Sequence, residues 1–487
     1  ARAVYDTLTA PGADGKIHPF LAKSVTANAD ATVFTITLPT GVKFHDGSAL
    51  TATVVKNNLD AYRGEYAGRN PLLLKFVFGP YIKDVVADDA ANTVTVTTNQ
   101  SWPAFPWYLW ASGRVGIMGQ AQLDSKNCDT DMIGTGPFKK QSFVPGPSGQ
   151  FVAVKNPNYW GKDEKGVQYP YLDRITFKVQ PSGADMLKGL QAGDYDMIQT
   201  SGAIQIQKIR DDSSLHYIES DKLAEVSFLM LNNTRAPGGG ECGGPCGVPF
   251  NNIHARKAVA YAIDREQVNK TRNLGLLKNA SGPFAEGVMG YLPDTGLPTY
   301  DPEKAKAEVA AYEKETGKKF EFTITIGADP ETAKTAALVQ TYLQQVGIKA
   351  STQVIGDQTQ YISQAIGKKF QAIFWRNYPG ADPDTLWVWW HCDNSATAAT
   401  DDCMNPVNFA GFNDPVINEN LEKGRTELDP AKRPQYYEAI NREFAKQLWA
   451  PWSQWTLWNI ASKPGIWGLW GPKLDRKSTR LNSSHRT

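Results

Sequence analysis

Strand-like and helix-like patterns alternate in the second half of the chain, and this alternation constrains the fold more than any other feature. Apolar and polar residues alternate strictly over Phe320–Ile326, which predicts a half-buried strand. An amphipathic pattern predicts a helix over 332–346, ended by Gly347. Further strands are expected over 348–355 and 370–375. Such alternation is typical of an α/β layer.

A second block of the same kind precedes it. Strands are expected over 174–179 and 195–198, with a helix over 184–191 between them. A buried strand, Val226–Leu231, then ends at Asn232. Because 487 residues exceed what a single core usually supports, we expect two or three domains. Thr51 and Asp301 are expected to be N-caps, so a helix is predicted to begin after each of them.

Composition and charge exclude some functions. The formal net charge is +1, with 51 basic and 50 acidic residues, and this balance argues against a nucleic-acid partner. No apolar run is long enough to cross a bilayer. The chain has neither an initiator Met nor a signal-peptide pattern at Ala1, so processing or truncation is expected to have removed the start. Residues 475–487 resemble the translation of a common sequencing-library adapter, and we exclude them as an artefact.

Two pairs of cysteines are close in sequence. Cys242 and Cys246 lie in a Gly/Pro-rich loop, and Cys392 and Cys403 bracket a polar loop. Two local disulfides are expected, each stabilising the fold by roughly 2–3 kcal/mol, and they would place the protein outside the cytoplasm. The alternative is a metal site in which His391 joins Cys392 and Cys403, although the spacing of zinc motifs is absent. Cys128 is left over, either free or paired outside this sequence.

The stretch 374–390 is the candidate site. It reads as a short strand, a turn set by Pro379, Gly380 and Pro383, and then an aromatic segment. One interpretation is a core strand followed by a packed helix. The other is the wall of a site that holds an apolar ligand and orients it with a few polar groups. Nothing indicates an enzyme: the motifs of hydrolases, zinc proteases and nucleotide-binding loops are absent, and no cofactor is expected.

Several segments, in order, resemble the extracytoplasmic solute-binding proteins that feed ABC importers, in the branch that handles peptides, nickel complexes and some oligosaccharides (family 5). Each segment is weak alone, and the ordered set across residues 5–460 carries the resemblance. The matching segments are Leu38–Gly47, Gly134–Phe138, Asn156–Gly161, Pro170–Ile175, Leu190–Asp196, Arg256–Arg265, Tyr300–Ala305, Gln344–Ile348 and Asp382–Asp384.

The resemblance implies an α/β fold of the periplasmic-binding-protein type II, with two lobes, a hinge and an inserted third domain. Residues 5–132 resemble the inserted domain, 133–226 with 457–474 an incomplete lobe one, and 227–456 lobe two. It also implies a monomer in the periplasm or on the outer face of the cell membrane, which delivers a small-molecule ligand to the permease subunits of an ABC transporter. Membrane association would come only through the permease or through a lipid anchor upstream of Ala1.

In peptide-binding members an Asp just after the strand pairs with the α-amine of the ligand, and this chain lacks it. Asn377, Tyr378 or Pro379 takes that place. A buried ammonium without a carboxylate loses a charge-assisted hydrogen bond worth ~1.5–3 kcal/mol, which disfavours a simple peptide with a free N-terminus. If Asp382 faces the ligand, its carboxylate can replace the missing partner of the ligand amine. Otherwise it caps local backbone NH groups. Arg376 is either a carboxylate clamp or a solvated strand end.

The resemblance brings further residues to the cleft. Stacking on a flat or apolar ligand or a sugar is expected from Trp375, Tyr361, Trp455, Trp102 and Trp107, unless they are core, and Asn232 offers an amide unless it satisfies turn backbone. The alternative ligands are an oligosaccharide and a metal complex or haem, with His391 or His45 as metal ligands. A secreted hydrolase is the remaining alternative.

Overall fold

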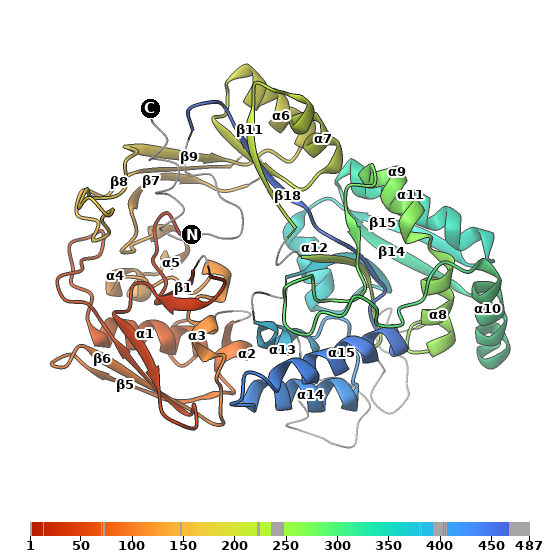
Figure 1. The fold of residues 1–487 in the computed structure, drawn as a ribbon, viewed down its shortest axis with the longest axis horizontal. Helices are drawn as coiled ribbons and strands as arrows, with labels where there is room; N and C mark the ends of the chain where they lie inside the picture. Colours follow the sequence, from red (N-terminus) through yellow and green to blue (C-terminus); the bar gives the residue numbers. More distant parts are fainter. Residues whose placement is uncertain are drawn as a thin grey trace. The chain divides into compact units, whose positions relative to one another are not determined.

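The computed structural model describes residues 2–466, apart from 13, 70, 72–73, 147–148, 222–224, 235–247, 379, 381, 393–402, 404 and 406. The chain forms two compact units (Figure 1). The first contains Ala1–Pro181 and Arg425–Asp429, and the second contains Ser182–Gly424 and Pro430–Ile466. In the part of the chain that is described, no helix is long and apolar enough to cross a bilayer.

The first unit contains an antiparallel sheet of four strands in the order β3-β4-β6-β5. Its strands show the expected alternation, since Phe34 and Ile36 of β4 are buried between partly exposed neighbours. The helix α1 follows, and the Thr51 hydroxyl accepts a hydrogen bond from the Val54 amide, which confirms the predicted N-cap. The elements of this unit are β1 (Thr9–Pro11), β2 (Ile17–Pro19), β3 (Ser24–Ala27), β4 (Val33–Thr37), α1 (Ala52–Arg63), α2 (Leu74–Phe78), β5 (Ile82–Asp88), β6 (Thr93–Thr98), α3 (Phe105–Tyr108), a 3-10 turn (Ala111–Gly113), α4 (Gln120–Asp124), α5 (Cys128–Asp131), β7 (Phe138–Val144), β8 (Gln150–Lys155) and β9 (Arg174–Lys178).

His45 joins two family-like segments within this unit. Its backbone amide donates to the Gly134 carbonyl at 2.9 Å, and its Nε2 lies 2.9 Å from the Gly136 carbonyl oxygen. Gly136 tolerates no side chain, because an added Cβ would lie 2.5 Å from the Val4 carbonyl carbon. The role of His45 here is therefore structural, and its ring shows no feature of a metal ligand.

His45 makes the stability of the first unit depend on pH. Burial lowers the pKa of its imidazole below the usual value of 6.5, so below that pH the unfolded chain binds a proton that the folded chain does not. The stabilisation is complete above pH 6.5 and is lost as the pH falls toward the lower folded pKa. We expect urea unfolding monitored between pH 7.5 and 5 to show this loss, and His45→Gln to flatten it. An equal slope in the variant would assign the acid sensitivity to other groups.

The second unit contains a six-stranded mixed sheet in the order β13-β17-β12-β16-β14-β15. The pairs β14–β15 and β14–β16 are parallel, and the other neighbours are antiparallel. The parallel part coincides with the strand–helix alternation predicted for residues 320–375. A smaller sheet of order β10-β18-β11 has its own apolar cluster around Leu190, Ile198 and Ile209.

One face of the large sheet is covered by α8, α10 and α11. Their apolar residues pack with Leu229 and Leu231 of β12 and Ile324 of β14 in one buried cluster. The elements of this unit are α6 (Gly183–Ala192), β10 (Met197–Thr200), α7 (Ala203–Asp211), β11 (His216–Ser220), β12 (Val226–Leu231), α8 (Ile253–Ala262), α9 (Arg265–Asn273), β13 (Lys278–Asn279), α10 (Pro302–Thr316), β14 (Glu321–Gly327), α11 (Pro330–Gln345), β15 (Lys349–Ile355), α12 (Gln358–Ile366), β16 (Ala372–Asn377), η3 (Pro383–Leu386), α13 (Trp387–Trp390), α14 (Pro415–Thr426), α15 (Arg433–Gln447), β17 (Trp452–Trp455) and β18 (Trp458–Ser462).

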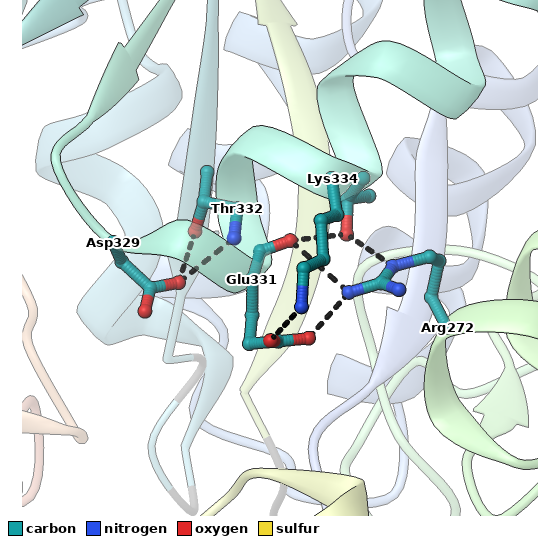
Figure 2. Close-up of polar contacts among 6 residues, drawn as sticks. Arg272, Asp329, Glu331, Thr332 and Lys334 are labelled. Carbon is teal, nitrogen blue, oxygen red and sulfur yellow. Dashed lines mark hydrogen bonds and ion pairs between the residues drawn. The ribbon is translucent and has the colours of Figure 1, made fainter. Parts of the chain in front are cut away.

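The starts of these helices follow local capping rules. Asp301 caps α10 through the Lys304 amide, as predicted. At α11 the Asp329 carboxylate accepts from the Thr332 amide and hydroxyl, both at 2.8 Å (Figure 2). Figure 2 also shows Glu331 bridging Arg272 of α9 and Lys334, so the first turn of α11 is fixed to its neighbouring helix.

The two units do not separate the predicted inserted domain (5–132) from the first part of the predicted lobe one, and residues 182–226 group with the second unit. The three-part division therefore stays a prediction. The adapter-like residues 475–487 and the end of the 457–474 segment lie outside the described residues.

Candidate ligand-binding site

The aromatic face of the large sheet in the second unit carries the candidate site. Side chains alternate between the two faces of a strand, so Trp375 and Asn377 of β16 point to the face opposite the α8–α11 cluster. Phe228 of β12 pairs with Trp375 and lies on the same face, and Trp452 of β17 pairs with Phe228. Residues from three strands that are distant in sequence thus form one surface.

A small cavity of about 30 Å³ opens on this face. Its lining comes from β12, β16, β17, α13, α15 and the segment 407–412, all within the second unit. The lining residues are Phe228, Met230, Trp375, Asn377, Trp389, Trp390, Val407, Phe409, Ala410, Phe412, Phe444, Ala450 and Trp452.

The lining divides into a rim and a buried wall. Trp375, Asn377 and Trp389 are half-buried and form the rim. Every other lining residue is buried, with at most 7% of its surface exposed. Within the stretch predicted to be either core or ligand wall, Trp387 and Trp390 pack inside, while Trp375 and Trp389 stay partly accessible. Its role as a ligand wall stays a prediction.

Ring contacts hold the rim in place. Tyr361 of α12 stacks on Trp375 with ring centroids 6.1 Å apart and planes at 13°. Its hydroxyl donates to the Phe374 carbonyl at 2.5 Å, and burial raises the pKa of that hydroxyl. Phe409 meets both Trp375 and Trp389 edge-on, at 5.7 and 5.4 Å. Such aromatic pairs are worth about 0.5–1.5 kcal/mol beyond their buried area.

Two buried asparagines position the segment that carries Phe409. Asn405 donates to the carbonyls of Val388 and His391, on α13 and just after it. Asn408 donates to the Trp390 and Phe412 carbonyls. These side chains donate hydrogen bonds to carbonyls at the C-terminal end of α13, which have no partners within the helix. The wall and the rim are thereby joined through α13.

Among the described lining residues Asn377 is the one amide, and none of these residues is charged. Its side-chain amide forms no hydrogen bond with another described residue, whereas its backbone pairs with Val226. An amide on an aromatic rim can donate to and accept from a ligand at once. The predicted ligand contacts Trp375 and Asn377 are thus brought together with Tyr361 behind them.

Arg376 does not join this group. It points to the other face of the sheet, where its Nη1 donates to the Ser201 hydroxyl at 3.0 Å and lies 3.9 Å from a Glu225 carboxylate oxygen. The adjacent Tyr378 is half-buried, and burial with the nearby Glu225 charge raises the pKa of Tyr378 to about 12. Arg376 and Trp375 therefore lie on opposite faces of β16, and a role of Arg376 as a carboxylate clamp stays a prediction.

Asp382 is committed to the protein. Its carboxylate accepts two hydrogen bonds from Arg433, at 2.7 and 2.9 Å, and one from the Asp384 amide at 3.0 Å. The side chains of Asp382 and Arg433 are each only 7% exposed. Of the two roles considered for Asp382, the cap of local backbone is the one observed, extended by an ion pair.

Trp102 is buried in the first unit, against the expectation of a stacking role. The guanidinium carbon of Arg425 lies 4.9 Å from the centroid of a Trp102 ring and 4.5 Å from the centroid of the Tyr81 ring. Arg425 also donates to the Tyr108 hydroxyl at 2.9 Å, so the aromatic group holds an arginine of the protein itself. Trp107, in the short helix α3, is half-buried and meets Trp110. Its ligand contact stays a prediction.

Trp455 and Asn232 also lie outside the cavity. Trp455 is 6% exposed and contacts Tyr291. Asn232 is fully buried, and its amide donates to the carbonyls of Lys368 and Phe370 while its oxygen accepts from the Thr234 amide. It thus serves turn backbone, the alternative considered for it.

Cys392 and Cys403 are thiols buried side by side. A hydrogen bond with Cys392 lowers the pKa of the Cys403 thiol, and Asn408 Nδ2 donates to Cys403 Sγ at 3.4 Å. Cys128 is also a free thiol. The His391 ring stacks on Trp387, and its Nε2 lies 3.2 Å from Glu422 Oε1. Within the described ranges, no group of three or more acidic, His or Cys side chains is placed to hold a metal. Cys242 and Cys246 fall outside the described residues.

The predicted disulfide between Cys392 and Cys403 can be tested directly. Their buried contact leads us to expect that protein exported to an oxidising compartment contains the bond. Alkylation in denaturant, followed by peptide mass spectrometry with and without reductant, should then give a linked peptide pair only without reductant. Both cysteines alkylated in unreduced protein would contradict the prediction. Cys128 supplies an internal control for complete alkylation.

Comparisons with known proteins agree with this architecture. The model of the family described as bacterial extracellular solute-binding proteins, family 5 Middle, matches residues 16–397. The probable D,D-dipeptide-binding periplasmic protein DdpA of Escherichia coli is 26% identical over 436 residues, 87% of this chain and 76% of that protein. The heme-binding protein A of Haemophilus influenzae is 26% identical over 394 residues, 76% of this chain and 68% of that protein.

Solved structures share the fold. The dipeptide-binding protein of Pseudoalteromonas sp. SM9913, in complex with Met-Leu, superposes with a TM-score of 0.82 at 17% identity, covering 97% of this chain and 92% of that one. At this identity the likeness concerns the fold alone. It confirms the predicted α/β class of the type II periplasmic binding proteins.

The sequence prediction missed two residues of the site. Trp389 was within the candidate stretch but was not chosen, and Phe409 lies beyond it. The signal for Trp389 was the helical spacing of Trp387–Trp390, because four consecutive helical residues cannot all face the core. Nothing local to Phe409 distinguishes it from an ordinary core residue.

Proposed function

The chain belongs to the bacterial extracellular solute-binding proteins of family 5, and we propose from this that it captures a peptide-like or other small organic ligand and delivers it to the permease of an ABC importer. The observation that carries the proposal is the accessible aromatic rim formed by Trp375, Trp389 and Asn377, whose side-chain amide bonds to no other described residue. Aromatic surface with a few polar groups is typical of small-molecule sites. No step of the function requires a reaction.

The absence of charge on the rim bears on the kind of ligand. Among the described residues of the lining there is no carboxylate that could pair with a ligand amine, and Asp382 is occupied by Arg433. A free N-terminus bound at this rim would lose its charge-assisted hydrogen bond. We therefore favour ligands whose part at this rim is neutral.

The location and the partner follow from the family. We place the protein outside the cytoplasm, because its relative DdpA is described as a periplasmic protein, and we expect the permease subunits of the importer to be its partners. In this proposal the ligand binds more tightly to a closed form of the two-lobed fold and so increases the closed population. The permease would distinguish the closed form from the open one.

Two measurements test the proposal. Native mass spectrometry of the purified protein should detect a small molecule that dissociates on denaturation. Small-angle scattering before and after saturation with that molecule should then show a decrease in the radius of gyration. Protein that carries no ligand and takes up none from a cell extract, or an unchanged radius at saturation, would count against the proposal.

A further inference from the structure

The cavity behind the rim constrains the ligand further, and the inference rests on the proposed solute-binding function. Its buried wall is apolar, with Met230, Val407 and Phe412 among its residues. The polar groups of the lining side chains are the Asn377 amide at the rim and indole NH groups. An ionised group placed here would lose its hydration without gaining a partner, at a cost that excludes it in practice.

The size of the cavity sets a second limit. Its volume is about 30 Å³, and each water-sized group needs about 10–15 Å³, so the cavity holds two or three such groups. That is the size of an ethyl or isopropyl tip. A phenyl ring or an indole does not fit without displacing the wall.

The wall resists such displacement. At most 2% of the surface is exposed for each of Phe412, Phe444 and Trp452. The ring centroids of Phe444 and Trp452 are 5.2 Å apart. Trp390 contacts both Phe444 and Trp452. Overpacking of a core of this density typically costs 1–3 kcal/mol, so a larger group would bind more weakly by about tenfold or more.

We propose that the ligand inserts a small, uncharged, branched aliphatic group between Trp375 and Trp389 into this cavity, while the Asn377 amide bonds to a neutral polar group next to it. The chain thereby selects against both cationic and bulky aromatic side groups at this position. Each methyl group that fills the cavity increases the affinity by about fourfold, equivalent to the 0.8 kcal/mol of one buried methylene.

A host–guest series of dipeptides tests the proposal. Gly-X, with X as Ala, Val, Leu, Phe, Lys or Glu, is titrated into ligand-free protein by calorimetry, together with the N-acetylated form of each. We expect Val or Leu to bind most tightly, Phe about tenfold more weakly, and Lys and Glu more weakly than Ala. N-acetylation should weaken binding less than threefold, because the rim has no carboxylate for an amine.

Three variants should each change which residue X of the Gly-X dipeptides binds most tightly, in a direction that the structure predicts. Val407→Ala enlarges the cavity and should move the optimum from Val toward Phe, and Ala450→Val should move it toward Ala. Asn377→Asp should raise the affinity for the Lys guest. Val339→Ala, on the buried side of α11, is the matched control that removes the same atoms elsewhere and should leave the order unchanged.

Tightest binding of the Phe or Lys guest by the unaltered protein would overturn the inference while leaving the solute-binding function intact. So would the same order of guests in all three cavity variants. A series in which no dipeptide binds would also overturn it. In that case the proposed solute-binding function would still be supported if another co-purifying ligand lowered the radius of gyration measured by small-angle scattering.

Discussion

Asp382→Asn should lower the free energy of unfolding of the second unit by about 3–5 kcal/mol. The change keeps the size of the side chain but removes the charge that Arg433 pairs with, and both side chains are 7% exposed. An uncompensated buried guanidinium is far more costly than the pair was favourable. Urea unfolding followed by tryptophan fluorescence, which reports on the aromatic face nearby, measures the loss.

The exposed pair of Glu303 and Lys306 is a matched control, because its side chains are 80% and 51% exposed. Glu303→Gln should change the stability by less than 1 kcal/mol. Replacing both partners, as Asp382→Leu with Arg433→Met, should recover most of the loss, since apolar pairs of similar volume often substitute for buried ion pairs. If Asp382→Asn were no more costly than Glu303→Gln, the pair would be as well solvated as a surface pair.

The same variant separates structure from ligand binding. Asp382 does not line the cavity, and Asp382→Asn protein that remains folded in the cold should bind the co-purifying ligand with unchanged affinity. A large loss of affinity at full folding would return Asp382 to the site where sequence reasoning had placed it. This readout distinguishes the two roles without assuming the identity of the ligand.

Local rules predicted much of the fold. Thr51 and Asp301 cap the helices they were expected to cap, and strict alternation placed β14 within one residue. Each of these signals acts over a few neighbouring residues, so the sequence alone carries it. The family resemblance, built from ordered short segments, supplied the fold class that local patterns could not.

The partners of charged residues could not be predicted. Arg433 reaches Asp382 across 51 residues, and Arg425 reaches Tyr108 across 317. No local pattern encodes contacts between such distant positions, which only the tertiary fold brings together. The position of Arg376 is a different case, because the period of two along a strand is visible in the sequence and places its side chain on the face opposite Trp375.

Trp375→Ala should weaken binding of the co-purifying ligand by about 1–3 kcal/mol. The indole lies on the rim, stacked on Tyr361 on the protein side and half-buried overall, so its remaining surface is available to a ligand. Truncation removes that contact and also part of the mouth of the cavity. Calorimetric titration at constant temperature measures the change, and Trp375→Phe should recover part of it.

Tyr300→Ala is the control for the loss of a ring as such. Tyr300 is a partly exposed aromatic residue of the second unit that contacts Tyr342 and does not line the cavity. Its truncation should leave the affinity unchanged. If Trp375→Ala lowered the stability as Tyr300→Ala does, with no loss of affinity, Trp375 would belong to the core alone. Ligand recognition would then have to depend on Trp389 and Asn377, whose own truncations become the decisive measurement.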